Sequence, residues 1–243
     1  MRISRLFVEQ TLAEHASITL ESDAAHYLRN VLRLKKGFQL TIFNGEGGEY
    51  SATINEVSRK LVSLTIGEWR EVNLESPLAI ELGLSVSRGE RMDVAIQKAT
   101  ELGVAVITPV ITQHCVVKLT EERRLQRHQH WQNIVYRACE QCGRNVPPTL
   151  NITADLAQWL DSDLPSSRII FEPGKTDTLK NYAKPDGNVV VLIGPEGGFS
   201  EQEVVEAQDT GFSALGFGPR VVRNETAAIA SIAAMQVLWG DMG

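Results

Sequence analysis

Two patterns of hydrophobic and polar positions divide the chain. In the first ~70 residues, alternating stretches at Gln39–Phe43, Glu49–Val57 and Leu61–Ile66 predict strands with one apolar and one polar face. A short apolar stripe at helical spacing, over residues 27–32, interrupts them. These patterns predict a small β-rich unit, a barrel of short strands with one helix.

Beyond this unit, apolar strands alternate with helices. We expect strands at Leu78–Val86, Val104–Pro109, Arg168–Phe171, Val189–Ile193 and Ala214–Phe217. We expect helices at Asp93–Leu102, Glu121–Cys142 and Glu225–Trp239. Ser200 with Glu203 forms a capping-box pattern that predicts the start of a further helix. Such alternation is typical of an α/β domain whose parallel sheet is covered by helices on both faces. The polar segment Glu68–Pro77 ends in proline, so we place two domains at residues 1–72 and 73–243.

Composition narrows the class of protein. Of the 243 residues, 43 % are hydrophobic and 22 % are charged, which is ordinary for a globular protein. No apolar run approaches the ~18 residues of a membrane helix, and the first residues lack a signal core, so we expect a cytoplasmic protein without a membrane partner. The net charge of −6 argues against nucleic-acid binding by bulk charge alone. Local clusters such as Arg29, Arg33, Lys35 and Lys36 could still bind phosphates, although solvated helix faces are the simpler interpretation.

Cys139 and Cys142 form a Cys-x-x-Cys motif. A zinc site would need a second pair of ligands at suitable spacing, and the sequence offers none. A redox motif would begin a helix, where the helix dipole lowers the thiol pKa, but this pair ends a predicted helix. We therefore expect structural cysteines and no metal.

The strongest chemical signal follows the predicted strand Val189–Ile193. The next residues, 194–200, read Gly-Pro-Glu-Gly-Gly-Phe-Ser. Ligands of open α/β sheets bind at the carboxyl ends of strands, and glycines there allow a close approach of the backbone. The loop lacks the lysine and spacing of a phosphate-binding loop, which indicates a ligand without a polyphosphate. A ligand-free tight turn would need fewer glycines.

A second glycine-rich strand end, Leu215–Arg220, runs into Val221–Ala227 and the last predicted helix. Asn224 is a plausible N-cap, and Glu225 lies in the first turn, where the helix dipole favours a carboxylate. Arg223 lies in the loop rather than on a helix face. Two such strand ends with a polar loop predict one composite pocket.

These paired segments, Leu192–Ser200 and Leu215–Ala227, resemble the ribosomal RNA small subunit methyltransferase E family, which belongs to the SPOUT class of knotted methyltransferases. The resemblance continues in Ser87–Met92, Gln97–Val104, Cys139–Arg144 and Arg2–Arg5, so it covers nearly the whole chain. The sequence departs from the family at Val222 and Asn224, where leucine and threonine are common. That departure leaves open whether Asn224 contacts the ligand.

The resemblance implies a SPOUT-type domain with a deep trefoil knot and an amino-terminal PUA-like barrel that binds RNA. It implies a homodimer that methylates N3 of uridine 1498 in 16S ribosomal RNA, in the decoding region, with assembled 30S subunits as the expected substrate. S-adenosylmethionine would be the cofactor. By resemblance, the residues expected around it are Leu192, Gly194, Pro195, Glu196, Gly197, Gly198, Leu215, Gly216, Gly218, Val222, Arg223, Asn224, Thr226 and Ala227.

The substrate constrains the catalytic residues, because N3 of uridine carries a proton that must leave before methyl transfer. We expect Arg223 to hold the uridine or its developing anion, and either Glu225 or Glu196 to act as base or orienting group. We expect RNA contacts from Arg2, Arg5, Arg29, Arg33, Arg88, Lys98 and Arg144. Two alternatives stay open, a SPOUT methyltransferase of another RNA and a ribosome-assembly protein without catalysis.

Overall fold

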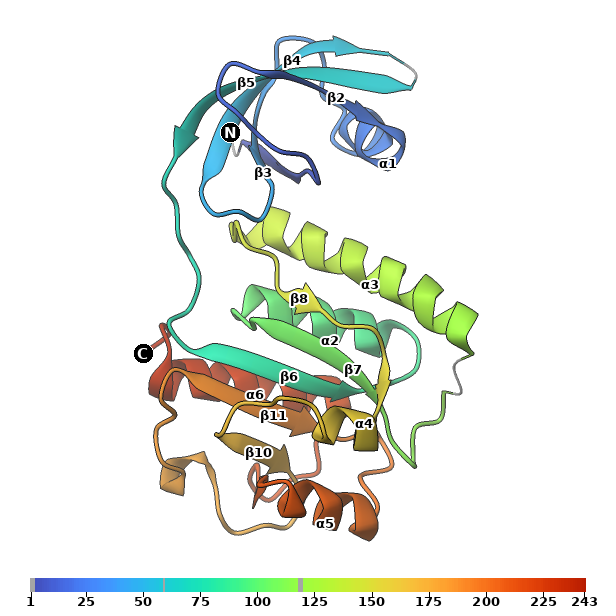
Figure 1. Ribbon diagram of the computed structural model, residues 1–243, viewed down its shortest axis with the longest axis vertical. Helices are drawn as coiled ribbons and strands as arrows, with labels where there is room; N and C mark the ends of the chain where they lie inside the picture. Colours follow the sequence, from blue (N-terminus) through green and yellow to red (C-terminus); the bar gives the residue numbers. More distant parts are fainter. Residues whose placement is uncertain (1–2, 59, 118–119) are drawn as a thin grey trace. The chain divides into compact units, whose positions relative to one another are not determined.

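The computed structural model describes residues 3–58, 60–117 and 120–243, which form two compact units (Figure 1). The first unit runs to Glu75 and also includes Cys139–Pro147; the second consists of Ser76–Ala138 and Pro148–Gly243. A division at residue 72 is close to the end of the first segment. That division leaves Cys139–Pro147 in the second domain, because a single cut in the sequence cannot place a later segment in the first unit.

The first unit is a curled five-stranded sheet with the order β1-β3-β4-β5-β2. Its strands are β1 (Ser4–Phe7), β2 (Ser17–Glu21), β3 (Gln39–Phe43), β4 (Glu49–Val57) and β5 (Leu61–Arg70). β1 pairs parallel to β3, and the other pairs are antiparallel. Alternate residues of each strand face one core, as the sequence pattern predicts.

The helix of this unit is short and irregular. An α-helix, α1 (Ser22–His26), continues directly into one π-helical turn, η1 (Tyr27–Val31). Leu28 packs into the barrel core, while Arg29 and Arg33 lie nearer the surface. Arg33 has a φ of 54°, which is uncommon for a residue with a side chain and ends the helical segment.

The second unit has a parallel sheet with the order β12-β10-β11-β6-β7-β8, and β9 also pairs with β7. Its strands are β6 (Ala79–Ser85), β7 (Val106–Ile111), β8 (Thr149–Leu150), β9 (Ala154–Asp155), β10 (Arg168–Phe171), β11 (Asn188–Ile193) and β12 (Ser213–Leu215). From Val189 to Ile193 the central strand β11 is fully buried, which explains its continuous apolar run.

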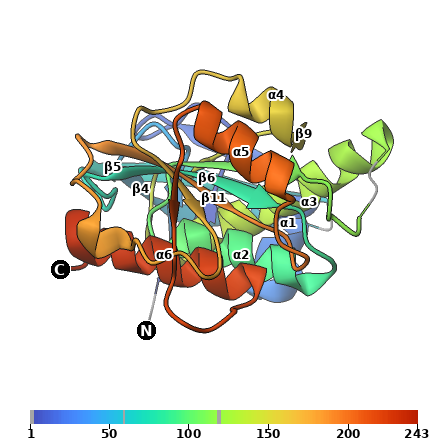
Figure 2. The same ribbon diagram turned by 90° about the horizontal axis from the view of Figure 1, so that it is seen from below.

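Helices cover both faces of this sheet (Figure 2). On one face α2 (Glu90–Glu101) packs against α6 (Asn224–Trp239), and on the other α4 (Leu156–Leu160) packs against α5 (Glu201–Asp209). The remaining helices are α3 (Glu121–Cys142) and the 3₁₀ turn η2 (Leu179–Asn181). The parallel α/β class is thus confirmed.

The local predictions vary in accuracy. The bounds of α3 are as predicted, and Ser200 and Glu203 form the predicted capping box at α5. The elements β8, β9 and α4 are too short to leave a periodic pattern, and the sequence did not indicate them. The trefoil knot stays a prediction.

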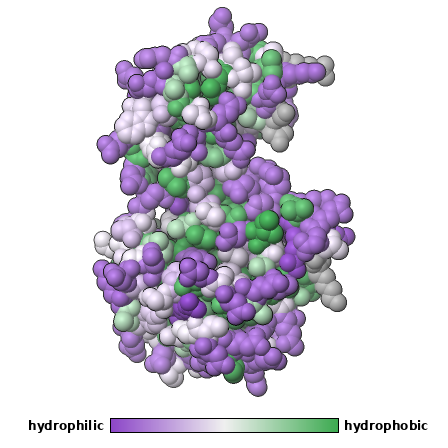
Figure 3. All heavy atoms as spheres, viewed as in Figure 1, coloured by the Kyte–Doolittle hydropathy of each residue, from purple (hydrophilic) through white to green (hydrophobic). Residues whose placement is uncertain are grey.

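Hydrophilic side chains predominate on the face drawn in Figure 3. Among the described residues, no helix combines the length and the apolar composition needed to span a bilayer.

Candidate functional site

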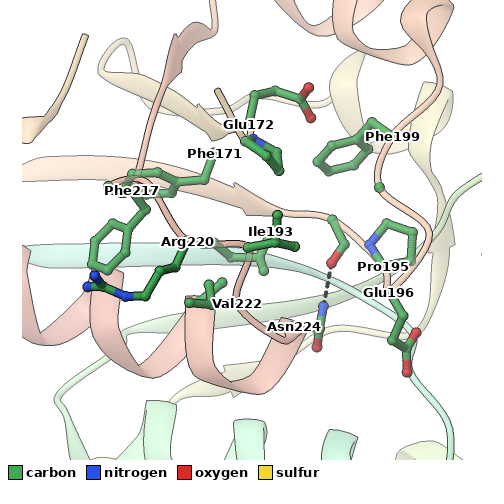
Figure 4. Close-up of a pocket in the computed structure, with 16 residues that line it drawn as sticks. Phe171, Glu172, Ile193, Pro195, Glu196, Phe199, Phe217, Arg220, Val222 and Asn224 are labelled. Atoms are coloured by element: carbon green, nitrogen blue, oxygen red, sulfur yellow. Dashed lines mark hydrogen bonds between the residues drawn. The ribbon is translucent and has the colours of Figure 1, made fainter. Parts of the chain in front are cut away.

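The carboxyl ends of three neighbouring strands meet at one edge of the second unit's sheet. Ile170 of β10 lies opposite Leu192 of β11 on one side and Ala214 of β12 on the other. The segments that follow these strands enclose a cavity together with the start of α6 (Figure 4). Its empty volume is about 660 Å³, including the part that is open to solvent.

Glycines at this edge are required by close packing. A Cβ on Gly216 would lie 2.0 Å from the carbonyl oxygen of Lys175, which is backbone and cannot rotate away. A Cβ on Gly194 would lie 2.8 Å from the ring of Phe199. Gly198 and Gly218 have φ values of 72° and 78°, so both need the freedom of glycine. The two glycine-rich segments therefore fold into tight turns that bring backbone to the cavity wall.

The start of α6 differs from the prediction in one residue. Arg223, with an extended ψ of 157°, is the N-cap, and Asn224 is the first helical residue. The Asn224 side chain does not cap the helix, because its Nδ2 donates to the carbonyl oxygen of Gly194 at 2.6 Å. This bond ties the turn after β11 to α6 and places Asn224 in the cavity wall.

The structure brings together many of the residues expected to hold the cofactor. Eight of them line the cavity: Gly194, Pro195, Glu196, Gly198, Gly218, Val222, Asn224 and Ala227. Leu192 and Leu215 are buried in the strands beneath, and Gly197 packs against His114. Arg223 and Thr226 are exposed near the helix start and do not belong to the wall.

The two candidate carboxylates have different surroundings. Glu196 accepts a hydrogen bond from Arg91 at 2.9 Å, so its charge already has a cationic partner. One oxygen of Glu225 is shielded from solvent and has no hydrogen-bond partner. An ionised carboxylate is an acceptor, so Glu225 retains accepting capacity.

The wall also contains eight residues that were not named as cofactor contacts: Phe171, Glu172, Pro173, Ile193, Phe199, Phe217, Arg220 and Val221. Of these, Phe171, Glu172 and Pro173 lie outside the paired segments Leu192–Ser200 and Leu215–Ala227, so sequence reasoning missed them. Phe171 and Phe217 contact each other edge to face, with ring centroids 5.5 Å apart. Burial raises the pKa of Glu172, and Lys175 opposes that shift. For Glu172, the signal available in the sequence was an acidic residue directly after a predicted strand.

The residues expected to contact RNA have different surroundings. Arg29 and Arg33 line a groove of the first unit with Lys35 and Lys36, next to Asn55–Val57. Arg88 is exposed, and Lys98 pairs with Glu101 at 2.8 Å. Arg2 lies outside the described residues.

Arg5 and Arg144 are corrections to the predicted RNA contacts. The Arg5 side chain is 13 % exposed, pairs with Glu49 and donates to Asn145 Oδ1 at 2.5 Å. The Arg144 side chain is 5 % exposed and donates to Glu75 at 2.5 Å and 2.9 Å. Both guanidinium groups hold the first unit together and are not available to phosphates.

The cysteines fit a structural role. Burial raises the pKa of the Cys139 thiol to about 12, so it stays protonated and is a poor nucleophile at neutral pH. Within the described ranges, no three His, Cys, Asp or Glu side chains gather as a metal site would require.

Comparison with known proteins gives the class. A family model for an RNA methyltransferase domain matches residues 74–236, and one for an RNA methyltransferase PUA domain matches residues 20–67. Fold, cavity and models together define an RNA methyltransferase with a PUA-like amino-terminal unit.

Relatives along the full length define the family. The chain is 36 % identical to ribosomal RNA small subunit methyltransferase E of Buchnera aphidicola subsp. Schizaphis graminum, over 99 % of this chain and 98 % of that protein. It is 28 % identical to the protein of that name from Bacillus subtilis, over 98 % and 100 %. The chain belongs to the ribosomal RNA small subunit methyltransferase E family.

Two solved structures resemble the chain over its whole length. A Legionella pneumophila methyltransferase in complex with S-adenosylmethionine superposes with a TM-score of 0.96 at 40 % identity. The ribosomal RNA small subunit methyltransferase E of Neisseria gonorrhoeae, bound to S-adenosylmethionine, gives 0.92 at 35 %. Each match covers 100 % of both chains.

Proposed function

We propose that this protein transfers the methyl group of S-adenosylmethionine to N3 of a uridine in 16S ribosomal RNA, with uridine 1498 as the expected position. The observation that carries the proposal is the cavity at the carboxyl ends of the neighbouring strands β10, β11 and β12. It lies in a chain that is similar over its full length to two proteins solved with that cofactor.

The lining of the cavity fits the cofactor in its chemistry. Bound there, S-adenosylmethionine supplies a methyl group already activated by its sulfonium. Glycine-rich turns at Gly194–Gly198 and Leu215–Gly218 bring backbone groups close to the ligand. Phe199 and Val222 supply apolar surface. The wall thus combines an apolar lining with a few polar groups, as ligand sites do.

Methyl transfer to uridine requires that the N3 proton leaves as the N–C bond forms and the S–C bond breaks. Arg223 is exposed at the start of α6 and would stabilise the negative charge that develops on the uracil ring. Between the two carboxylates, the contacts favour Glu225 as the base or orienting group, since Glu196 is held by Arg91.

The RNA would be bound mainly by positively charged side chains that contact its phosphates. The groove with Arg29, Arg33, Lys35 and Lys36 would neutralise phosphates, and Arg88 and Lys98 would contribute from the second unit. A locally cationic groove explains how a protein with net charge −6 can bind RNA.

We propose a homodimer in the cytoplasm that acts on assembled 30S subunits. Support for a dimer comes from α6, which is apolar around most of its circumference and leaves Val237 and Leu238 exposed. A helix that is apolar on all sides is usually buried, and a second copy could cover this face.

The test is methyl transfer from labelled S-adenosylmethionine to 30S particles that lack the modification, followed by nucleoside analysis of the digested RNA. We expect the label in N3-methyluridine. Label in another nucleoside would keep the enzyme class and overturn the proposed target. No transfer to 30S particles or to free RNA, despite cofactor binding, would contradict the reaction.

A further inference from the structure

Glu172 is a wall residue without an assigned role. It directly follows β10, and its backbone N–H donates to the carbonyl oxygen of Leu215 at 2.9 Å, which fixes its place at the sheet edge. Figure 4 shows its side chain between Phe171 and Phe199, across the cavity from Arg220 and Val222. A carboxylate is therefore held in a wall that is otherwise mainly apolar on this side.

The carboxylate oxygens of Glu172 are free to accept hydrogen bonds from a ligand. No hydrogen bond or ion pair joins it to any residue that the structure describes, and Lys175 acts on it only through the longer-range field. Glu196, the other carboxylate in the wall, is engaged by Arg91. Partial burial without a partner disfavours the charged form, so a ligand that donates hydrogen bonds would relieve an existing cost.

The position of Glu172 in the sheet indicates which ligand group it would meet. The glycine-rich turn follows β11, and Glu172 follows β10, the parallel neighbour of β11. In nucleotide-binding α/β sheets, an acidic residue near such a turn accepts hydrogen bonds from ribose hydroxyls. A vicinal diol offers two O–H donors on one side of the sugar, and a carboxylate has two acceptor oxygens.

We propose that Glu172 accepts hydrogen bonds from the 2′ and 3′ hydroxyls of the ribose of the bound cofactor. This inference rests on the proposed function, because it takes the adenosine-containing methyl donor as the ligand of this cavity. Glu172 then fixes the ribose at the β10 side of the cavity. The substrate class of the site becomes a ribonucleoside derivative, and a 2′-deoxy analogue should bind less well.

The test compares three ligands on four proteins by calorimetry. The ligands are S-adenosylhomocysteine, its 2′-deoxy analogue and S-adenosylmethionine. The proteins are the unaltered chain, Glu172→Ala, Glu172→Gln and Glu201→Gln. Glu201 is an exposed residue of α5 outside the cavity and serves as the matched control. The unaltered protein and the control should prefer the ribose form by about 10-fold or more, since a hydrogen bond to a charged group is strong.

In Glu172→Ala the preference for the ribose form should fall to near unity, and Glu172→Gln should lie between. Equal weakening of both ligands, with the preference intact, would overturn the inference while leaving cofactor binding in place. Weaker binding of S-adenosylmethionine but not of S-adenosylhomocysteine would also overturn it, because the carboxylate would then be acting on the sulfonium charge. If the unaltered protein bound neither ligand, the proposed function would fail as well.

Discussion

The cavity of the second unit and the cationic groove of the first offer a ligand different kinds of interaction. The cavity depends on glycines that allow close backbone contact and on aromatic side chains, and its carboxylate Glu196 is paired with a cation. The groove depends on four cations along η1 and the following turn. Shape-based sites are sensitive to single atoms, whereas charge-based sites are sensitive to salt. Damage to the two regions should therefore be distinguishable.

The largest effect is expected from Arg223→Ala. Loss of a cation beside the developing uracil anion should lower kcat by about 100-fold or more. Cofactor affinity should change little, because Arg223 lies outside the cavity wall. Single-turnover kinetics with calorimetry measure both quantities. Full turnover with normal cofactor binding would show that Arg223 has no catalytic role.

The next largest effect is expected from a substitution of Gly216, with Gly197 for comparison. Gly216→Ala should lower stability by about 1 to 3 kcal/mol and weaken cofactor binding at least 10-fold, because its Cβ would overlap backbone. Gly197→Ala is the matched control, since its Cβ would lie 3.0 Å from the Cβ of the exposed His114, a contact that a small shift relieves. Thermal unfolding and calorimetry would test this order, and equal effects would contradict it.

A smaller effect is expected in the groove. The double variant Arg29→Ala with Arg33→Ala should reduce the slope of log affinity against log salt by about 1.5 for RNA, at about 0.7 to 0.9 per phosphate contact. Cofactor affinity should not change. Lys180→Ala with Lys184→Ala removes two exposed lysines of the second unit and should leave the slope unaltered. The same slope in both double variants would refute a phosphate-binding groove.

The smallest effect concerns stability and pH. The pKa of Glu172 is raised mainly by burial, so the folded state binds this proton more tightly than the unfolded chain does. Stability is then lost as the pH rises from the ordinary value of 4.5 through the raised pKa. Glu172→Gln should therefore raise Tm slightly at pH 7 and have no effect well below pH 4.5. Lys175 is the cation that limits the gain. A lower Tm at pH 7 would contradict this.

Features of the structure could be predicted from the sequence when the interacting residues lie close together along the chain. The capping box of Ser200 and Glu203 was visible because both partners lie within one turn. The role proposed for Glu172 was not, because it depends on β10 lying beside β11, and local periodicity does not reveal which strands pair. Arg5 was misread as an RNA contact because its partners Glu49 and Asn145 are far away in the sequence. Local chemistry is readable from sequence, and long-range satisfaction of charges is not.

The first unit includes Cys139–Pro147, so it is complete only after α3 has been synthesised. Chains emerge from the ribosome amino end first, and domains usually fold as units as they emerge. Here the first unit still lacks Arg144 and Asn145 when Glu75 has been made, so the partner of Glu75 and one of the partners of Arg5 arrive only after α3. The nascent barrel must wait for them while the first strands of the second unit are already forming. A ribosome-bound chain ending at residue 75 should be cut by protease much more readily than one extending past Pro147.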